Sequence, residues 1–218
     1  MTHLGPYELN RVHLGDCIEL MKSMPDKCID LVATDPPYGV DLDYGNGYDD
    51  SFESWKILID NTLNEMIRIS NGAVLVPTSK IEGEAYLYTK NPKWRIAWHK
   101  GATSTRCAIG FKDWETVFVF GSKFPKQLHD YFKITPEHKD SIARAHPCPK
   151  PVRFSKWLID KFSKEDDIIF DPFSGSGTTG VAAIQTGRRF LGFEIDPRWC
   201  DLANKRIEAA KAQGVLAL

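Results

Sequence analysis

The chain has 218 residues, of which 42% are apolar and 26% charged, a composition typical of soluble globular domains and unlike that of disordered or membrane proteins. It contains no apolar run long enough to span a bilayer and no N-terminal pattern typical of a secretion signal. The net charge of −1 is unevenly distributed: residues 90–164 hold sixteen Lys or Arg and six Asp or Glu, a net +10, which leaves −11 elsewhere. A basic segment suits nucleic-acid phosphates, although a solvated basic surface would look the same.

Apolar runs of strand length alternate with amphipathic stretches of helix length. In chain order we expect a strand at 29–34, a helix at 54–70 capped by Ser54, a strand at 73–76, a helix at 80–89, strands at 94–98 and 115–120, a helix at 151–162, a strand at 168–170, a helix at 177–186, a strand at 190–193 and a helix at 197–211. This alternation predicts an α/β fold with a parallel sheet covered by helices on both faces.

The domain organisation predicted from this pattern is simple. We expect one domain over residues 1–218, with the polar, basic and aperiodic residues 121–145 as a small insertion. We expect all six tryptophans in the core. The five cysteines are scattered, with no Cys-x-x-Cys pair and no zinc-type spacing, so we expect free thiols, no metal and a cytoplasmic location.

A glycine-rich turn between a predicted strand and helix is the candidate cofactor site. The run from Asp171 to Gly180 ends in Gly-x-Gly-x-x-Gly, and Glu194 ends the next predicted strand nineteen positions after Gly175. Such a turn brings the backbone close to a ligand, and such a carboxylate accepts hydrogen bonds from ribose hydroxyls. The pattern therefore predicts a nucleoside-containing cofactor.

A nicotinamide dinucleotide would satisfy the glycine pattern equally well. S-adenosylmethionine is favoured by Asp171, because a carboxylate just before the turn can pair with an ammonium group but would repel a pyrophosphate. It is also favoured by the short chain that follows the motif, about forty residues, which is too little to complete a doubly wound sheet. The cofactor half must then be completed by the N-terminal part of the chain.

Asp35-Pro36-Pro37-Tyr38 is the most specific motif in the sequence. A Pro-Pro turn that merely ends a strand would explain the prolines but not the flanking carboxylate and ring. An exocyclic amino group is a poor nucleophile because its lone pair is delocalised. Hydrogen bonds accepted by the Asp35 carboxylate and the Pro36 carbonyl would localise that lone pair, and the prolines would fix the carbonyl in advance. Tyr38 would stack on a base extruded from a duplex.

Together with His146-Pro147-Cys148-Pro149-Lys150-Pro151, these motifs resemble the beta class of DNA amino-methyltransferases, in which the catalytic motif precedes the cofactor motif. The resemblance spans nearly the whole chain. It implies a Rossmann-like methyltransferase fold with a mostly parallel seven-stranded sheet, one antiparallel strand and a circularly permuted motif order. It also implies that Asp16 of Gly15-Asp16 meets the cofactor adenine and that Lys150 lies along the methionine end.

The resulting site prediction has three parts. The catalytic residues are Asp35, Pro36, Pro37 and Tyr38. The residues expected to bind S-adenosylmethionine are Asp16, Cys17, Lys150, Asp171, Phe173, Gly175, Gly177, Thr178 and Glu194. The residues expected to contact DNA are Arg106, Lys112, Lys123 and Lys126, for which a plain surface-charge role is the alternative.

By the same resemblance, target recognition falls on residues 121–145, which is short for a module that reads sequence. Either the specificity is short and degenerate, or a second copy of the chain in a homodimer contributes to it. Residues 39–53 hold five acidic and no basic residues. We interpret them as a mobile lid that orders only when base and cofactor are bound, in preference to a calcium site, because the EF-hand spacing is missing.

The leading hypothesis is methyl transfer from S-adenosylmethionine to adenine N6 in double-stranded DNA, because Asp at the first motif position resembles the adenine enzymes. Cytosine N4 methylation is the main alternative. Others are a NAD-dependent oxidoreductase, an inactive nucleic-acid-binding module, and methylation of RNA or of protein glutamine.

Overall fold

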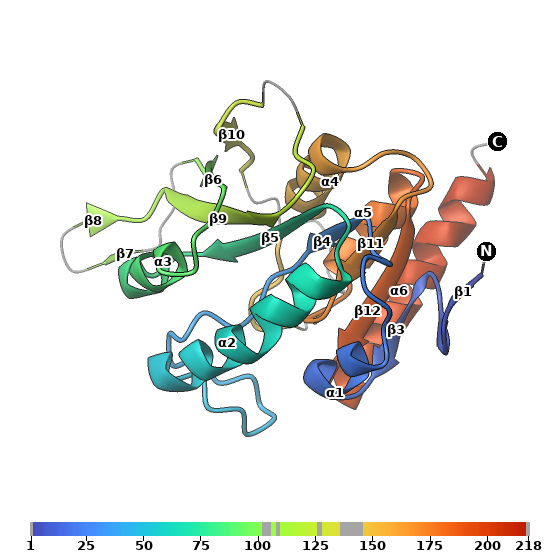
Figure 1. The fold of residues 1–218 in the computed structure, drawn as a ribbon, viewed down its shortest axis with the longest axis horizontal. Helices are drawn as coiled ribbons and strands as arrows, with labels where there is room; N and C mark the ends of the chain where they lie inside the picture. The colour runs from blue at the N-terminus through green and yellow to red at the C-terminus, as the bar shows by residue number, and fades with distance from the viewer. Residues whose placement is uncertain (1, 102–105, 108–109, 126–127, 136–145, 217–218) are drawn as a thin grey trace.

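A computed structural model describes residues 2–101, 106–107, 110–125, 128–135 and 146–216. The strands, coloured along the chain in Figure 1, are β1 His3–Leu4, β2 Tyr7–Glu8, β3 Arg11–Leu14, β4 Leu31–Ala33, β5 Ala73–Thr78, β6 Trp94–His99, β7 Arg106–Cys107, β8 Gly110–Phe111, β9 Trp114–Gly121, β10 Tyr131–Lys133, β11 Ile168–Asp171 and β12 Arg189–Glu194. The helices are α1 Cys17–Lys22, α2 Phe52–Ile69, α3 Ile81–Tyr88, α4 Val152–Phe162, α5 Thr178–Gln185 and α6 Pro197–Leu216.

The main sheet has the order β10-β6-β9-β5-β4-β11-β12-β3. Strand β9 runs antiparallel to both of its neighbours, and the other pairings are parallel. The predicted mostly parallel sheet with one antiparallel strand is therefore confirmed, but within the described residues it has eight strands where seven were expected. The additional strand is β10, which forms the edge of the sheet next to β6 and lies inside the segment predicted to be aperiodic.

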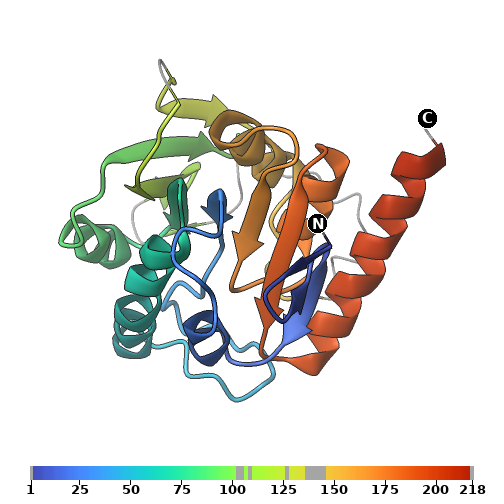
Figure 2. The same cartoon turned by 45° about the vertical axis from the view of Figure 1, so that its right-hand side comes forward.

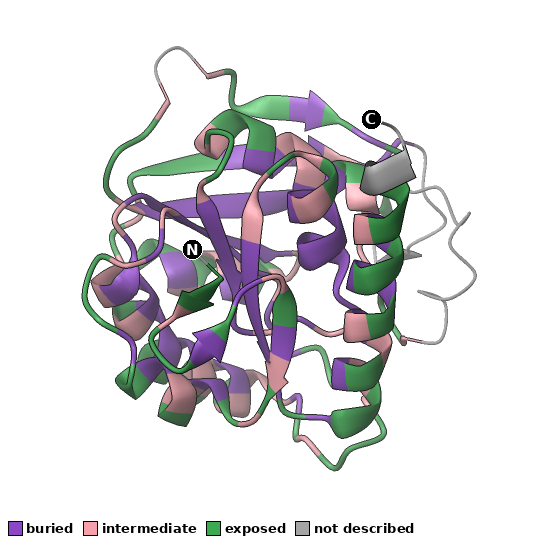
Figure 3. Ribbon diagram, turned by 90° about the vertical axis from the view of Figure 1, so that its right-hand side faces the viewer, coloured by how far each residue is buried: buried purple, intermediate pink, exposed green. Residues whose placement is uncertain are grey.

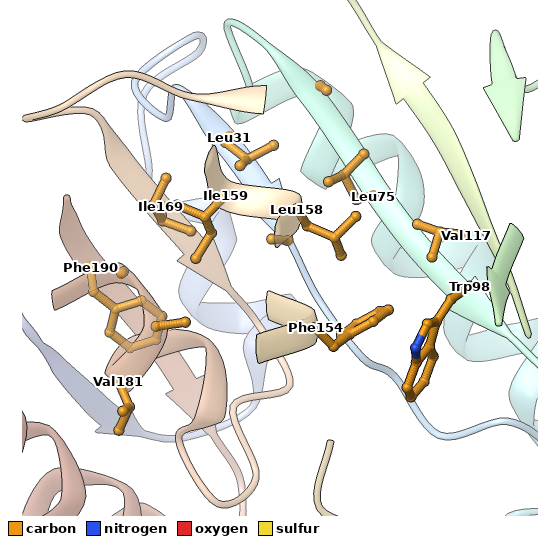
Figure 4. Packing of buried hydrophobic residues seen from close by; sticks show 14 of the residues in the cluster. Leu31, Leu75, Trp98, Val117, Phe154, Leu158, Ile159, Ile169, Val181 and Phe190 are labelled. Atoms are coloured by element: carbon orange, nitrogen blue, oxygen red, sulfur yellow. The ribbon is translucent and has the colours of Figure 1, made fainter. Parts of the chain in front are cut away.

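Helices cover both faces of the sheet, as the alternation predicted, because successive residues of the central strands point to opposite sides. Leu31, Leu75 and Ile169 pack with α4, α5 and α6 in one core cluster, which Figure 4 shows from close by. Val32, Val74 and Phe170 pack with α1, α2 and α3 in the other. Figure 2 shows α6 running along the outside of this arrangement.

Several local expectations were wrong. The α2 helix begins two residues before the predicted start because Ser51, whose hydroxyl accepts a hydrogen bond from the Ser54 amide at 3.3 Å, is its N-cap. The sequence did not predict several short elements, because segments of two to six residues carry too few apolar positions to show a period. These elements are β1, β2, β3, α1, β7 and β8.

The tryptophans divide by position. Trp55 and Trp98 are buried as predicted, but Trp94 and Trp114, the first residues of β6 and β9, are 54% and 49% exposed. Exposure elsewhere follows the layers: Figure 3 shows buried central strands and a C-terminal helix whose outer side is exposed. In the part of the chain that the structure describes, every helix is too short or too polar to cross a bilayer.

Candidate active site

The two sequence motifs meet because their strands are neighbours. Strand β4 pairs in parallel with β11, Val32 opposite Phe170, so that the chain leaves both strands at the same edge of the sheet. Thr34 then donates a hydrogen bond from its hydroxyl to the Asp171 carboxylate at 2.7 Å. Asp35 and Asp171 line one cavity of about 690 Å³. The catalytic and cofactor motifs, far apart in the chain, therefore form one site.

Asp171 is a buried carboxylate that suits a cationic ligand. Its side chain accepts hydrogen bonds from Thr34 and, at 3.0 Å, from the Phe173 amide. No ion pair to Asp171 is found among the described residues, and burial raises its pKa to about 7, against the effect of these hydrogen bonds. A bound ammonium group would supply the missing counter-charge.

The glycine turn wraps around the next part of the cavity. Gly175 and Gly177 have φ of 48° and 77°, a left-handed backbone that favours glycine. A Cβ on Gly177 would lie 2.7 Å from that of Ala203, so the turn must approach α6 closely. Glu194, at the end of β12, accepts hydrogen bonds from the Gly175 amide at 2.7 Å and the Asp196 amide at 2.9 Å. Its carboxylate is thus held at the cavity wall.

Gly177 packs against Ala203 and is not among the residues that line the cavity, so its predicted contact with the cofactor is not supported. The other predicted cofactor residues do line the cavity; besides Asp171, Gly175 and Glu194, they are Asp16, Cys17, Lys150, Phe173 and Thr178. Asp16 is the N-cap of α1, and its carboxylate accepts from the Ile18 amide at 2.8 Å. Together with the buried carboxylates of Asp171 and Glu194, these residues offer hydrogen-bond acceptors that fit a nucleoside carrying an amino acid, such as S-adenosylmethionine.

The four residues of the catalytic motif line the same cavity. The Tyr38 hydroxyl donates to the Asp35 carboxylate at 2.8 Å, and the Asp35 side chain keeps 28% of its exposure. Burial raises the pKa of Asp35, partly countered by the Lys150 ammonium 3.6 Å away. Lys150 therefore contacts the Asp35 carboxylate and also lines the cavity that the resemblance assigns to the cofactor.

An aromatic wall that the sequence did not reveal closes another side of the cavity. It consists of Tyr44, Tyr48, His146 and Trp199, with the His146 ring 4.9 Å from that of Trp199 and 6.5 Å from that of Tyr44. Burial lowers the pKa of His146 to about 4, so its ring is neutral near pH 7. No local sequence pattern marks this wall, because its members come from three distant segments and the helix pattern around Trp199 predicts a core position.

The acidic loop that carries Tyr44 and Tyr48 is organised around one buried carboxylate. Asp50 accepts hydrogen bonds from the amides of Gly39, Val40 and Leu42 at 2.9, 3.2 and 3.0 Å. Asp49 is also used locally, since it accepts from the Ser54 hydroxyl at 2.5 Å. These two carboxylates stabilise the loop and the start of α2, which accounts for part of the acidic composition of this segment.

The predicted DNA contacts lie at two different edges of the sheet. Because β9 runs antiparallel, its start lies at the cavity edge and its end at the opposite edge. Lys112, just before β9, donates to the Ser79 carbonyl at 3.0 Å, whereas Lys123, just after it, donates to the Asn71 side chain at 2.8 Å. Arg106 begins β7, in the hairpin that projects beyond β9 in Figure 1. Lys126 lies outside the described residues.

The model of one protein family, described as DNA methylase, matches residues 79–205, more than half of the chain. The chain belongs to this DNA methylase family. The DNA adenine methyltransferase YhdJ of Escherichia coli K12 is similar over nearly all of the chain, with 27% identity covering 96% of this chain and 86% of YhdJ.

Two solved structures share the fold of this DNA methylase. The Thermus thermophilus protein TTHA0409, in complex with S-adenosyl-L-methionine, has a TM-score of 0.69 and 25% identity, covering 92% of this chain and 93% of that one. The cytosine-N4-specific PvuII DNA methyltransferase has a TM-score of 0.73 and 19% identity, covering 93% and 91%. Membership of the family disfavours the NAD-dependent alternative, which would also leave the catalytic motif without a role.

Asp50→Asn should loosen the loop of residues 39–50. The asparagine side chain keeps one acceptor oxygen and turns an NH₂ group towards amides that need acceptors, a loss of ~1 kcal/mol or more. We expect hydrogen exchange at residues 39–42 to accelerate about fivefold or more by mass spectrometry, since such a loss corresponds to that ratio.

Asp43→Asn is the matched control for this experiment. Asp43 is exposed and accepts a single hydrogen bond, from the Gly45 amide at 2.7 Å, which asparagine can also accept. Equal exchange in the two variants would show that Asp50 does not organise the loop.

Proposed function

We propose that this protein transfers a methyl group from S-adenosylmethionine to the N6 atom of adenine in double-stranded DNA, and that residues 1–218 form one catalytic domain. The observation that carries the proposal is the junction of the two motifs, in which Thr34 bonds Asp171 while its neighbour Asp35 faces the same cavity. A methyl donor bound by Asp171 and an amino group bound by Asp35 would therefore lie in the same cavity.

In this proposal one group of residues binds the methyl donor and another binds the target base. S-adenosylmethionine supplies an electrophilic methyl group when it is bound. Asp171 pairs with the ammonium, Glu194 accepts from the ribose hydroxyls, and Asp16 accepts from the adenine amino group of the donor. These carboxylates are held by backbone amides or by Thr34, so little reorganisation is needed when a ligand enters.

Asp35, Pro36 and Tyr38 act on the target base. The Asp35 carboxylate and the Pro36 carbonyl accept hydrogen bonds from the amino group, which localises the nitrogen lone pair for attack. As the nitrogen gains the methyl group it must lose a proton, and Asp35 is the acceptor in this proposal. Tyr38 packs against the extruded base, which has to leave the duplex before its amine can be reached.

Adenine is preferred over cytosine because Asp begins the catalytic motif, a feature that resembles the adenine enzymes. The similarity to YhdJ supports the same choice, whereas the PvuII enzyme shows that this fold also accommodates cytosine N4 chemistry.

Product analysis tests the proposal directly. Purified protein should be incubated with double-stranded DNA and S-adenosylmethionine carrying a labelled methyl group, and the DNA digested to nucleosides for mass spectrometry. We expect label in N6-methyladenine. Label in N4-methylcytosine would correct the target base, and label only in parallel RNA or protein reactions would overturn DNA as the substrate.

Two aspartate variants should separate chemistry from donor binding. Asp35→Ala should abolish methyl transfer while leaving donor affinity within about tenfold. Asp171→Asn should weaken donor binding by about tenfold or more, since a buried charge–charge contact is lost. It should not unfold the protein, because it removes a buried carboxylate whose ionisation opposes folding. Calorimetry and single-turnover rates measure both effects.

The pH dependence of donor binding provides an internal check on Asp171. Its pKa is raised to about 7 in the free protein, so the carboxylate is protonated below that pH and cannot pair with an ammonium. Affinity for the donor should therefore fall as the pH is lowered from about 7 to about 5.5, up to about tenfold per unit. Asp171→Asn should flatten this slope; an equal slope in both proteins would contradict the assignment.

Lysine variants at the two edges of the sheet should differ in DNA binding. Lys112→Ala should weaken binding and lower the slope of log K against log salt by roughly 0.9, the value for one phosphate contact. Lys123→Ala, at the far edge, is the control and should leave both unchanged. An effect of Lys123→Ala larger than that of Lys112→Ala would place the DNA on the other edge. Fluorescence anisotropy at several salt concentrations measures both.

A further inference from the structure

A second group of buried charges lies directly behind the catalytic motif. Lys100 follows β6, Glu115 is the second residue of β9, and Lys150 stands before α4. The antiparallel register of β6 and β9, with Trp98 opposite Glu115, brings the first two together. Lys150 arrives from a distant part of the chain. None of this grouping follows from a short sequence motif.

The group is connected to Asp35 by short contacts. The Glu115 carboxylate accepts from the ammonium groups of Lys100 and Lys150, each at 3.0 Å. The Lys150 ammonium also lies 3.6 Å from the Asp35 carboxylate and 4.6 Å from the centre of the Tyr38 ring. The Tyr38 hydroxyl faces both carboxylates, at 2.8 Å from Asp35 and 3.3 Å from Glu115.

These side chains are held away from solvent, where charges are costly. Lys100, Glu115 and Lys150 keep only 9–10% of their side-chain exposure. With Asp35 they form two ammonium–carboxylate pairs of zero net charge. A buried ion-pair cluster contributes little stability compared with apolar residues of the same size. Its position against the catalytic carboxylate therefore points to a role in the reaction.

We propose that Glu115 and Lys150 are positioning residues that fix the orientation and the charge of the Asp35 carboxylate for methyl transfer, with Lys100 holding Glu115. The proposal rests on the proposed function of Asp35. Lys150 gives Asp35 a cation, and Glu115 keeps that cation from collapsing onto Asp35, so that Asp35 retains acceptor capacity for the amino group. Tyr38 is held between them through its hydroxyl.

The two residues should influence Asp35 in opposite directions. Burial raises the pKa of Asp35; the Lys150 ammonium lowers it, and the Glu115 carboxylate raises it further. The other titratable groups that act on or are affected by Asp35 are Tyr38, Tyr44, Cys148 and Asp171. None of these four is a cation near neutral pH, so Lys150 is the positive charge that balances Asp35 among the described residues.

The test compares Lys150→Met with Glu115→Gln. Removal of the Lys150 ammonium should raise the pKa of Asp35 by about one unit, and removal of the Glu115 carboxylate should lower it. The same opposite shifts should appear in the acid limb of the kcat profile. We expect Lys150→Met to lower kcat at neutral pH by about tenfold or more while the KM for the donor changes less than about threefold.

The titration can be followed without substrate, by ¹³C NMR of protein labelled at aspartate carboxyl carbons, with the Asp35 signal identified by its loss in Asp35→Asn. If the wild-type protein fails to methylate DNA, the proposed function is wrong. The titration of Asp35 would still show whether Glu115 and Lys150 control the charge of its carboxylate. Lys150→Arg and Glu115→Asp keep the charges, so the pKa of Asp35 in these variants should lie closer to the wild-type value than in Lys150→Met and Glu115→Gln.

Shifts in the same direction, or no shift, in the Met and Gln variants would overturn the proposal. So would a Lys150→Met variant that loses donor affinity with unchanged kcat, because Lys150 would then belong to the donor site. If either variant fails to fold, Lys100→Met provides the second measurement. Lys100 forms its ion pair with Glu115 in the described part of the chain, so without Lys100 the Glu115 carboxylate would bind Lys150 more strongly, and the pKa of Asp35 should again rise.

Discussion

The parallel pairing of β4 with β11 is the contact on which the active site depends. It places the ends of two strands, far apart in the chain, side by side at one edge of the sheet, and the Thr34–Asp171 hydrogen bond joins them there. Both strands lie in the middle of the sheet, with helices packed on each face, so the ends that they share are supported on both sides by the core. The glycine turn, the catalytic motif and the loop that follows it are all attached to this edge.

The site handles its buried carboxylates in two ways. Asp171 lacks a counter-cation among the described residues and relies on hydrogen bonds, which leaves it suited to a ligand that brings a positive charge. Asp35 has a built-in cation in Lys150, which Glu115 shares. The difference suits the proposed division of labour, since the donor carries an ammonium group whereas the amino group of a base is neutral.

The motifs that could be predicted are those whose backbone requirements leave a local trace. Pro36 and Pro37 follow the end of β4, and Gly175 and Gly177 adopt the left-handed backbone of the turn. Because proline and glycine are favoured in such backbone conformations, the sequence predicts these positions. Glu115 and Lys100 leave no such trace. A glutamate at the start of a strand and a lysine after one look like ordinary surface residues until the register of β6 and β9 turns them inward.

By itself the sequence determined the α/β class, the main helices and strands of the sheet, the two motifs and the family they resemble, because periodicity, proline and glycine act over a few residues. Tertiary structure alone decided the strand order, the eighth strand β10, the aromatic wall around His146, the charge cluster behind Asp35 and the separation of Lys112 from Lys123. These depend on which strands pair and in which direction. That choice is governed by the packing of whole faces against helices, which no short stretch of sequence encodes.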